Sequence, residues 1–505
     1  MNLLGKNISA NLLSNVWLTG LMLVLTPLYI LFLGVESYGL IGFYLSWIAI
    51  LGILDTGISA TAVREIAWLA SRPEEKQRIP VLIRSLEVVY WGVILILGLG
   101  ILTGAWFFGA GWFHLKDLQP GVVREVMMLM AVSLVVQVPS GLYIGGLMGL
   151  QRQVECSGLL AFFGTVRGGG SIMVLWLVSP DIRIFFLWHI VASVLQTGVM
   201  RWSLWRKVSQ GEYPVRFSLE ILRSIKGFAA TMMLITVLGI IIAQADKMIL
   251  SRVVSLEAFG FYMLAWTVSS GLSRGVTPLI EAFFPKFTEL VSIGDDQGLA
   301  NQVHLASQLM SVLIIPPAML IVFLSKPILF AWLGSDSAAE GVAPILSVMA
   351  LGTVFAGSSF PALSVLYSRK RLNPVVAVNL ICLVVLLPLL ILAVVYFGVM
   401  GAASIWGLYG FILYVAYQFY GLQGLPNTGL FSSILRDFIA PCIISFSVAG
   451  IAGFLLSEVS GKITFVFLLS IALLVGWVAA LLVCKDLRKI LMDKWKWRWG
   501  WKSAL

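Results

Sequence analysis

The sequence predicts an all-α integral membrane protein with about fourteen transmembrane helices. Hydrophobic residues make up 59% of the 505 residues, charged residues only 11%, and the mean hydropathy is +0.97. A soluble domain carries roughly 25% charged residues. Apolar stretches long enough to cross a hydrocarbon core of about 30 Å recur along the whole chain. We expect them to be helices, because an open strand would leave backbone groups unpaired in lipid.

The expected spans follow one another with short connections, and none of these connections has room for a large extramembrane domain. The spans are 9–33, 39–63, 80–105, 122–147, 156–178, 182–204, 227–250, 256–283, 303–326, 342–367, 373–397, 400–422, 434–456 and 463–484. Lys6 precedes the first apolar stretch, and no small-residue cleavage site follows a short apolar core. We therefore interpret residues 9–33 as a retained span and not as a cleaved signal peptide.

Lysine and arginine are distributed unequally between alternate connections. With a cytosolic N-terminus, most of the 34 Lys and Arg residues fall on the inner side. The outer segments then hold only Lys116, Arg124, Arg183, Lys247, Arg252, Lys326 and Lys462. Cytosolic loops of membrane proteins are enriched in positive residues. Both termini are therefore predicted to be cytosolic, and the number of spans to be even.

The net charge of +10 follows from these inner loops and does not require nucleic acid as a partner. The four cysteines are scattered through apolar stretches without metal-ligand spacing, and we expect free buried thiols. The sequence contains no phosphate-binding GxxxxGK[ST] loop. We expect neither a metal nor a cofactor.

An internal repeat divides most of the chain into two parts. The tripeptide at 42–44 (GFY) recurs 218 residues later at 260–262, and at the same offset GIS at 57–59 aligns with GVT at 275–277. Six spans separate the copies, so the two halves share one topology, as in transporters built from parallel repeats. We expect an N-terminal lobe at 1–210, a C-terminal lobe at 211–424, and two appended helices with a basic, Trp-rich tail at 425–505. We expect the tail to anchor at the cytosolic leaflet.

Three segments resemble a known family. They are residues 39–64 in the second span, the GLQR tetrapeptide at 149–152 after the fourth span, and QADKMIL at 244–250. These segments resemble the bacterial polysaccharide and oligosaccharide flippases of the multidrug/oligosaccharidyl-lipid/polysaccharide exporter superfamily. The resemblance implies two six-helix lobes around a central cavity, alternating access, and a polyprenyl-diphosphate-linked oligosaccharide as cargo. It also implies the bacterial cytoplasmic (inner) membrane and a role in cell-surface polysaccharide biosynthesis.

Arginines inside or at the ends of spans are the candidate substrate-binding residues, because a permanently charged guanidinium with forked donors suits a phosphate pair. Arg274 lies toward the middle of the span 256–283; its alternative role is a structural pair with Glu281 or another acid. Arg167 precedes three glycines, 168–170, which either break the helix near a site or form a tight helix crossing. Arg64 either recruits phosphate at the cytosolic mouth or is a positive anchor.

Acidic residues in the spans are candidates for ion coupling or gating, because ionisable groups at membrane depth usually face a cavity or a partner. Asp55 either carries a coupling proton or pairs with an arginine. Asp246 either caps a helix or locks the lobes together, and since its neighbour Lys247 is adjacent on a helix, we expect the two to have separate partners. Glu281 is expected to form a gate salt bridge. His189 and His304 are expected to be packed side chains and not proton relays.

We therefore predict a secondary transporter and not an enzyme, with H⁺ or Na⁺ as the coupling ion. Membrane lipids, the lipid-linked glycan and other polysaccharide-export proteins are the expected partners. One alternative is a cation-coupled multidrug exporter, for which an acidic or aromatic cavity is expected. A second is a glycan polymerase or ligase, for which substantial outer loops with catalytic charges are expected. A third is a passive scaffold of the export complex.

Overall fold

The computed structural model describes residues 3–208, 215–426, 428–456, 459 and 461–489. Within helices, the side chains of 3–9, 54–57, 73, 110, 224–236, 238 and 277 lie outside this description. The regular structure of the described residues is helical, apart from one isolated bridge between His114 and Ser255. The predicted all-α membrane fold is confirmed. The basic tail beyond residue 489 lies outside the described residues.

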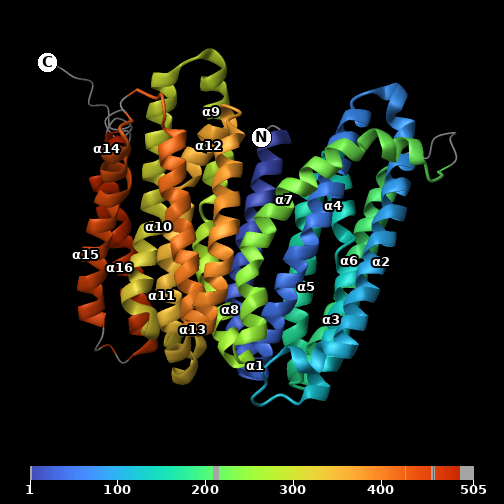
Figure 1. Ribbon diagram of the computed structural model, residues 1–505, viewed down its shortest axis with the longest axis horizontal. Coiled ribbons are helices and arrows are strands. Elements are labelled where there is room, and N and C mark those ends of the chain that lie inside the picture. Colours follow the sequence, from blue (N-terminus) through green and yellow to red (C-terminus); the bar gives the residue numbers. More distant parts are fainter. Residues whose placement is uncertain (1–2, 209–214, 427, 457–458, 460, 490–505) are drawn as a thin grey trace. The chain divides into compact units, whose positions relative to one another are not determined.

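The helices vary greatly in length (Figure 1). Their bounds are α1 Leu3–Ala70, α2 Ile79–Trp112, α3 Pro120–Gln137, α4 Ser140–Gly149, α5 Gln153–Leu177, α6 Ile182–Lys207, α7 Leu219–Val253, α8 Leu256–Arg274, α9 Thr277–Ile293, α10 Asp296–Leu333, α11 Asp336–Ser358, α12 Phe360–Ser368, α13 Leu372–Gly421, α14 Leu430–Ile434, α15 Ala440–Leu456 and α16 Lys462–Val483. A short 3₁₀ turn, η1, covers Pro73–Arg78, and a π-helical turn, η2, covers Leu435–Ile439.

Ten helical segments of the described residues are long and apolar enough to cross a membrane. Two of these segments lie in α1 and α13, helices that each cover two predicted spans joined without a loop. The chain turns at Gly34 in α1, where φ is 77°, and at Gly398 in α13, where φ is 57°. Only glycine adopts positive φ without a steric penalty from Cβ. The predicted spans 9–33 and 39–63 are therefore the two arms of α1, and 373–397 and 400–422 are the arms of α13.

Three predicted spans are interrupted, each close to a proline. The span 122–147 is divided between α3 and α4 at Val138–Pro139, and the span 342–367 between α11 and α12 just before Pro361. The span 256–283 is divided between α8 and α9 just before Pro278. Proline lacks the N–H that would continue a helix, but it fits the first turn of a new one. The prediction of one continuous helix over 256–283 is therefore wrong.

The described chain forms two compact units, Met1–Gly260 and Phe261–Leu505. In the first unit, α1 packs against α4, α5 and α7, and α3 lies between α2 and α6. In the second unit, α10 packs on α11, which in turn packs on α13, while α15 and α16 lie side by side against α10 (Figure 1). The predicted division at residues 210 and 424 stays a prediction.

The same unusual turn follows α4 in the first unit and α12 in the second. Gln151 has φ 60° and Lys370 has φ 55°, the positive-φ non-glycine residues of the described chain. In both turns the next amide donates to a carbonyl five residues earlier, Arg152 to Leu147 at 2.9 Å and Arg371 to Leu366 at 2.8 Å. Two matching strained turns, 219 positions apart, agree with the internal repeat in the sequence.

Glycines bring the helices of each unit into backbone contact. A Cβ on Gly145 of α4 would lie 2.7 Å from the Ser59 carbonyl oxygen of α1, and one on Gly149 would lie 2.9 Å from Cβ of Ile66. In the second unit, a Cβ on Gly421 of α13 would lie 2.6 Å from the Ala362 carbonyl oxygen of α12. Small residues allow this close approach, and with it dispersion contacts that lipid does not replace.

A buried polar network holds the last helices of the chain to α10. His304, Gln308 and Ser311 are spaced so that they lie on one face of α10. The carboxylate of Asp437 in η2 bonds His304 Nδ1 and accepts from Gln308 Nε2 at 2.8 Å, while the Ser311 hydroxyl donates to the Asp437 carbonyl at 2.6 Å. This face of α10 therefore binds both the side chain and the backbone of one acidic residue.

The same glutamine also holds the segment that follows α16. Gln308 Nε2 donates to the Asp486 carboxylate at 2.8 Å, and its Oε1 accepts from the Asp486 amide at 3.1 Å. Arg436 Nε donates to Asp437 at 3.0 Å and adds a positive charge to the two carboxylates. The network therefore holds the start of the η2–α15 segment and the end of α16 against one helix.

We predict that Gly145→Ala destabilises the protein by about 1–3 kcal/mol, because its Cβ would displace the backbone of α1. The measurement is thermal unfolding of the full-length protein in detergent. Gly92→Ala on α2 is the matched control, because a Cβ there meets nothing within 4 Å. Equal melting temperatures for the two variants would contradict the packing of α4 on α1.

We predict that Asp437→Leu costs about 3–5 kcal/mol, because it leaves the buried donors of His304 and Gln308 without an acceptor. Glu289→Gln, which removes an exposed partner of Lys286, should cost no more than about 1 kcal/mol. Adding His304→Phe to Asp437→Leu should recover part of the loss in the same unfolding assay. Strictly additive effects would show that the two side chains are not coupled.

Candidate functional site

Arg167 is the one predicted substrate-binding residue that lies deep within a helix bundle. It is half-buried midway along α5 and donates from one guanidinium nitrogen to Gln196 Oε1 of α6. Its Nε is buried without a hydrogen-bond partner in the described structure. Among the described residues, no carboxylate forms an ion pair with it. A cation at this depth is costly without an anionic partner.

Two further polar side chains of α6 lie near Arg167 and are unsatisfied. His189 and Ser193 precede Gln196 by seven and three residues, so the three side chains follow one face of α6. Within the described structure, both ring nitrogens of His189 and the Ser193 hydroxyl are buried without a hydrogen-bond partner. The His189 ring packs against Phe185, with the ring centroids 4.2 Å apart. Buried polar groups are normally paired, so this cluster is exceptional.

Two tyrosines of α1 complete the polar cluster from the opposite side. The Tyr29 hydroxyl donates to the Gly168 carbonyl at 3.2 Å and bonds Ser171 at 2.8 Å. The Tyr44 hydroxyl donates to Gln137 Oε1 at 2.8 Å and bonds Ser133 at 2.7 Å, both on α3. Both tyrosine side chains lie within electrostatic range of Arg167. We call the set Tyr29, Tyr44, Arg167, His189, Ser193 and Gln196 the arginine cluster.

The glycines after Arg167 do not break the helix. α5 is continuous from Gln153 to Leu177, and the side chains of Leu25 and Trp188 lie directly over Gly168 and Gly170. The Trp188 indole also donates to the Val166 carbonyl at 3.1 Å. Of the two interpretations of this glycine stretch, the structure supports the tight helix crossing, because α1 and α6 approach the α5 backbone where side chains are missing.

Arg274 lies at the end of a helix and not in the middle of one. α8 ends at Arg274, the side chain is exposed, and α9 begins at Thr277. A cation in the last turn of a helix is stabilised by the helix dipole. Glu281 is exposed on α9. The prediction that Arg274 lies toward the middle of one continuous helix is wrong, because the chain breaks at Gly275–Val276. Its role in substrate binding stays a prediction.

The remaining candidate residues occupy three different environments. Arg64 is 58% exposed near the end of the second arm of α1 and lies 3.8 Å from Glu65. Asp55 belongs to the same arm, but its side chain lies outside the described residues. Lys247, only 2% exposed on α7, donates to Asp246 at 3.1 Å and to the Ala243 carbonyl at 2.9 Å. Contrary to our expectation, these adjacent residues contact each other, because the flexible lysine chain folds back over its own helix.

Sequence reasoning missed two buried carboxylates that fix the first unit. Glu87 of α2 is 3% exposed and accepts from Arg84 at 3.2 Å, from Arg201 at 2.9 Å and from the Trp205 indole at 2.9 Å. The sequence could have indicated Glu87, because it is an acidic residue inside the predicted span 80–105. Glu36, two residues after the turn at Gly34, accepts three consecutive backbone amides of the 116–118 loop at 2.8–2.9 Å.

Charge pairs outside the spans stabilise the connections of the first unit. Lys116 Nζ donates to the Glu257 carboxylate at 3.0 Å, and this hydrogen bond raises the pKa of Lys116. The hydrogen bonds from Arg183 lower the pKa of Asp181, the residue that caps α6. The first pair joins the loop after α2 to the start of α8, and the second rigidifies the α5–α6 turn.

Comparison with solved structures identifies the fold. The protein described as "Lipid II flippase MurJ, inward closed conformation" superimposes with a TM-score of 0.69 at 15% identity, covering 95% of this chain and 98% of that one. An inward-facing multidrug resistance transporter of the MATE family, from the MOP superfamily, gives 0.62 at 13% identity, covering 84% and 95%. A MOP superfamily transporter from Pyrococcus furiosus gives 0.51 at 11% identity, covering 82% and 96%. At these identities the matches show the fold alone.

Sequence comparison identifies the family. No curated protein matches this chain. A family described as polysaccharide biosynthesis protein matches residues 4–291, more than half of the chain, including all helices from α1 to α8. With the transporter fold and the apolar helices, this match agrees with the resemblance found in the sequence. The chain therefore belongs to the polysaccharide biosynthesis protein family, and it is a multi-pass membrane protein with the same fold as the solved lipid II flippase and MATE-family structures.

Proposed function

We propose that this chain is a flippase that moves a polyprenyl-diphosphate-linked oligosaccharide across the bacterial cytoplasmic membrane for cell-surface polysaccharide biosynthesis. The observation that carries the proposal is Arg167, a cation at membrane depth that has no carboxylate partner among the described residues. A diphosphate must cross the membrane as an anion, and a preplaced guanidinium offsets its desolvation. The family match and the name of the flippase with the same fold support the same class of cargo.

The proposed cycle uses the three arginines in sequence. Arg64, exposed near the end of an α1 arm, attracts the diphosphate at the cytosolic mouth, and in this proposal both chain termini are cytosolic. Arg167 and Arg274 then interact with the head group while the two lobes alternate between inward and outward access. A gradient of H⁺ or Na⁺ resets the cycle through Asp55, Asp246 or Glu281. Other proteins of polysaccharide export receive the product.

The rival functions fit the arginine cluster less well. A cation exporter needs a site that attracts positive charge, whereas an unpaired guanidinium repels it. A polymerase or ligase needs outer catalytic groups, whereas in the connection between α2 and α3 the backbone amides of 116–118 bond Glu36 and the Lys116 ammonium bonds Glu257. The described residues also contain no group of His, Cys, Asp and Glu suited to a metal ion.

We predict that Arg167→Gln lowers glycan export about ten- to a hundredfold at equal protein level, because a charge-assisted hydrogen bond is worth roughly 1.5–3 kcal/mol. Arg274→Ala should lower export to a similar degree. Surface polysaccharide and accumulated lipid-linked precursor are measured in the same cells. Arg206→Gln is the matched control: it removes an exposed arginine of α6 that packs over Trp202.

The two readouts separate loss of transport from loss of synthesis. Precursor should accumulate as surface polymer falls, since the block lies after assembly of the lipid-linked unit. Normal export by both Arg167→Gln and Arg274→Ala, at normal protein level, would overturn their assigned roles. A parallel loss in Arg206→Gln would show that the effect does not depend on these positions.

A further inference from the structure

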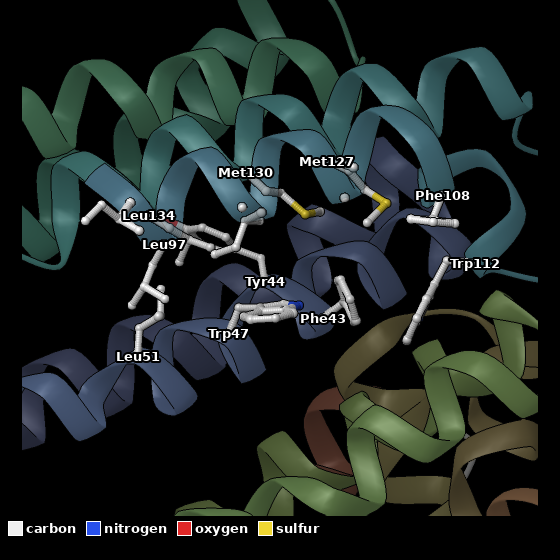
Figure 2. Close-up of a pocket in the computed structure, with 15 residues that line it drawn as sticks. Phe43, Tyr44, Trp47, Leu51, Leu97, Phe108, Trp112, Met127, Met130 and Leu134 are labelled. Carbon is white, nitrogen blue, oxygen red and sulfur yellow. The ribbon is translucent and has the colours of Figure 1, made fainter. Parts of the chain in front are cut away.

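An apolar pocket of about 430 Å³ lies within the first unit, between the second arm of α1 and helices α2 and α3. Figure 2 shows Phe43 and Trp47 of α1 facing Met127 and Met130 of α3 across it. Its lining consists almost entirely of aromatic, aliphatic and methionine side chains. Thioether side chains adapt to irregular apolar shapes, which suits a flexible hydrocarbon ligand.

The rim of this pocket is formed by residues that face outward from the unit. Ile96 of α2 is 71% exposed and Phe108 is 69% exposed, and both line the pocket. They belong to the segment Glu74–Gly109, which is long and apolar enough to cross a membrane. We take the surroundings of this rim to be hydrocarbon, so that an occupant enters sideways from the membrane without crossing water.

Two glycines of α2 create the width of the pocket. Gly100 and Gly104, one turn apart, both line it, and a Cβ at either position would meet nothing within 4 Å. Elsewhere in the unit, glycines such as Gly145 are in contact with a neighbouring backbone. At Gly100 and Gly104 the missing side chains leave space for a ligand and do not serve helix packing.

Tyr44 connects the pocket to the arginine cluster. Its ring forms part of the pocket wall, and the same ring packs edge-on against His189 with the centroids 6.0 Å apart. Its hydroxyl bonds Ser133 and Gln137, and its side chain lies within electrostatic range of Arg167. An apolar pocket thus lies beside a cationic, polar cluster, and the two together match a ligand with an anionic head and a long apolar chain.

We infer that this pocket binds part of the prenyl chain of the lipid-linked substrate while its head group crosses the membrane. This inference rests on the proposed function, because the substrate class comes from there. The methyl-branched chain lies against the aromatic and methionine walls and remains continuous with the membrane at the rim. The chain is then held by the same unit that holds the diphosphate, so head and chain move together with one set of helices.

The test is photolabelling of the full-length protein in lipid nanodiscs with a polyprenyl phosphate that carries a diazirine on its chain. Labelling is expected within residues 96–108 of α2 and around Met127 and Met130 of α3. Gly100→Leu and Gly104→Leu place a side chain in the pocket and should lower labelling there about tenfold, the effect of losing contact with roughly two methylene groups. Gly92→Leu is the matched control on the same helix, since a Cβ there also meets open space but Gly92 does not line the pocket.

A second probe, a diacyl phospholipid with the same diazirine, decides which lipid occupies the pocket. Unlabelled polyprenyl phosphate should compete with this phospholipid probe and abolish its labelling of the pocket. Persistent phospholipid labelling under this competition would overturn the assignment to the prenyl chain. Absence of any polyprenyl label at the pocket of the wild-type protein would also overturn it, whether or not the leucine variants fold.

Export measured in the same variants separates this inference from the proposed function. If the pocket binds the chain during transport, Gly100→Leu lowers glycan export and Gly92→Leu does not. Unchanged export by a folded Gly100→Leu variant, together with strong dependence on Arg167, would overturn the pocket and leave the flippase intact. Polyprenyl labelling of the pocket in a protein that exports no glycan would support chain binding and overturn the flippase.

Discussion

The lack of water at membrane depth is the constraint on which this structure depends. Every backbone polar group there must be paired within the protein, so the described chain is helical and interrupts its helices only where other groups complete the bonding. The interruptions occur at glycines with positive φ, at prolines that begin a new helix, and at turns such as Gln151 and Lys370. Ionisable side chains are governed by the same cost. Glu87 and Asp437 each bind several donors from neighbouring helices, so their burial fixes how those helices pack.

In the arginine cluster, by contrast, the described residues do not pair every buried polar group. Arg167 has a glutamine as its hydrogen-bond acceptor, its Nε is unpaired, and His189 and Ser193 are also unsatisfied. Other arginines of this chain have carboxylate partners: Arg201 donates to Glu87 and Arg369 donates to Asp296. A half-buried cation with spare donors is stabilised when an anion arrives, and under the proposed function this links its desolvation cost to substrate binding. Tyr44 extends the link to the neighbouring apolar pocket, so one unit offers separate environments for a charged head and an apolar chain.

Composition and span spacing were sufficient to predict the fold class and the places where helices lie, and the resemblance of three short segments indicated the family. They could not predict how spans are joined, because a positive φ at Gly34 or Gly398 turns one helix into two arms without any loop residues to mark it. The break before Pro278 moved Arg274 from a predicted helix centre to a helix end. The sequence also could not predict which side chains on different helices form hydrogen bonds with each other. The spacing of His304, Gln308 and Ser311 marks one polar face of α10, but their acceptor Asp437 lies more than a hundred positions away and is brought there by packing alone. Likewise, nothing in the sequence distinguishes the open glycines 100 and 104 from those that pack helices together.

The central claim is that this chain itself carries a lipid-linked anionic glycan across a membrane. The most direct measurement is translocation in sealed proteoliposomes that contain only the purified protein, lipids and a polyprenyl-diphosphate oligosaccharide with a fluorescent sugar. Accessibility of the sugar to a membrane-impermeant reagent is followed with time under imposed H⁺ and Na⁺ gradients. The account predicts that the protein makes the sugar change sides much faster than in protein-free vesicles, with the substrate chemically unchanged. Equal rates with and without protein under every gradient, or conversion of the glycan into another product, would contradict it.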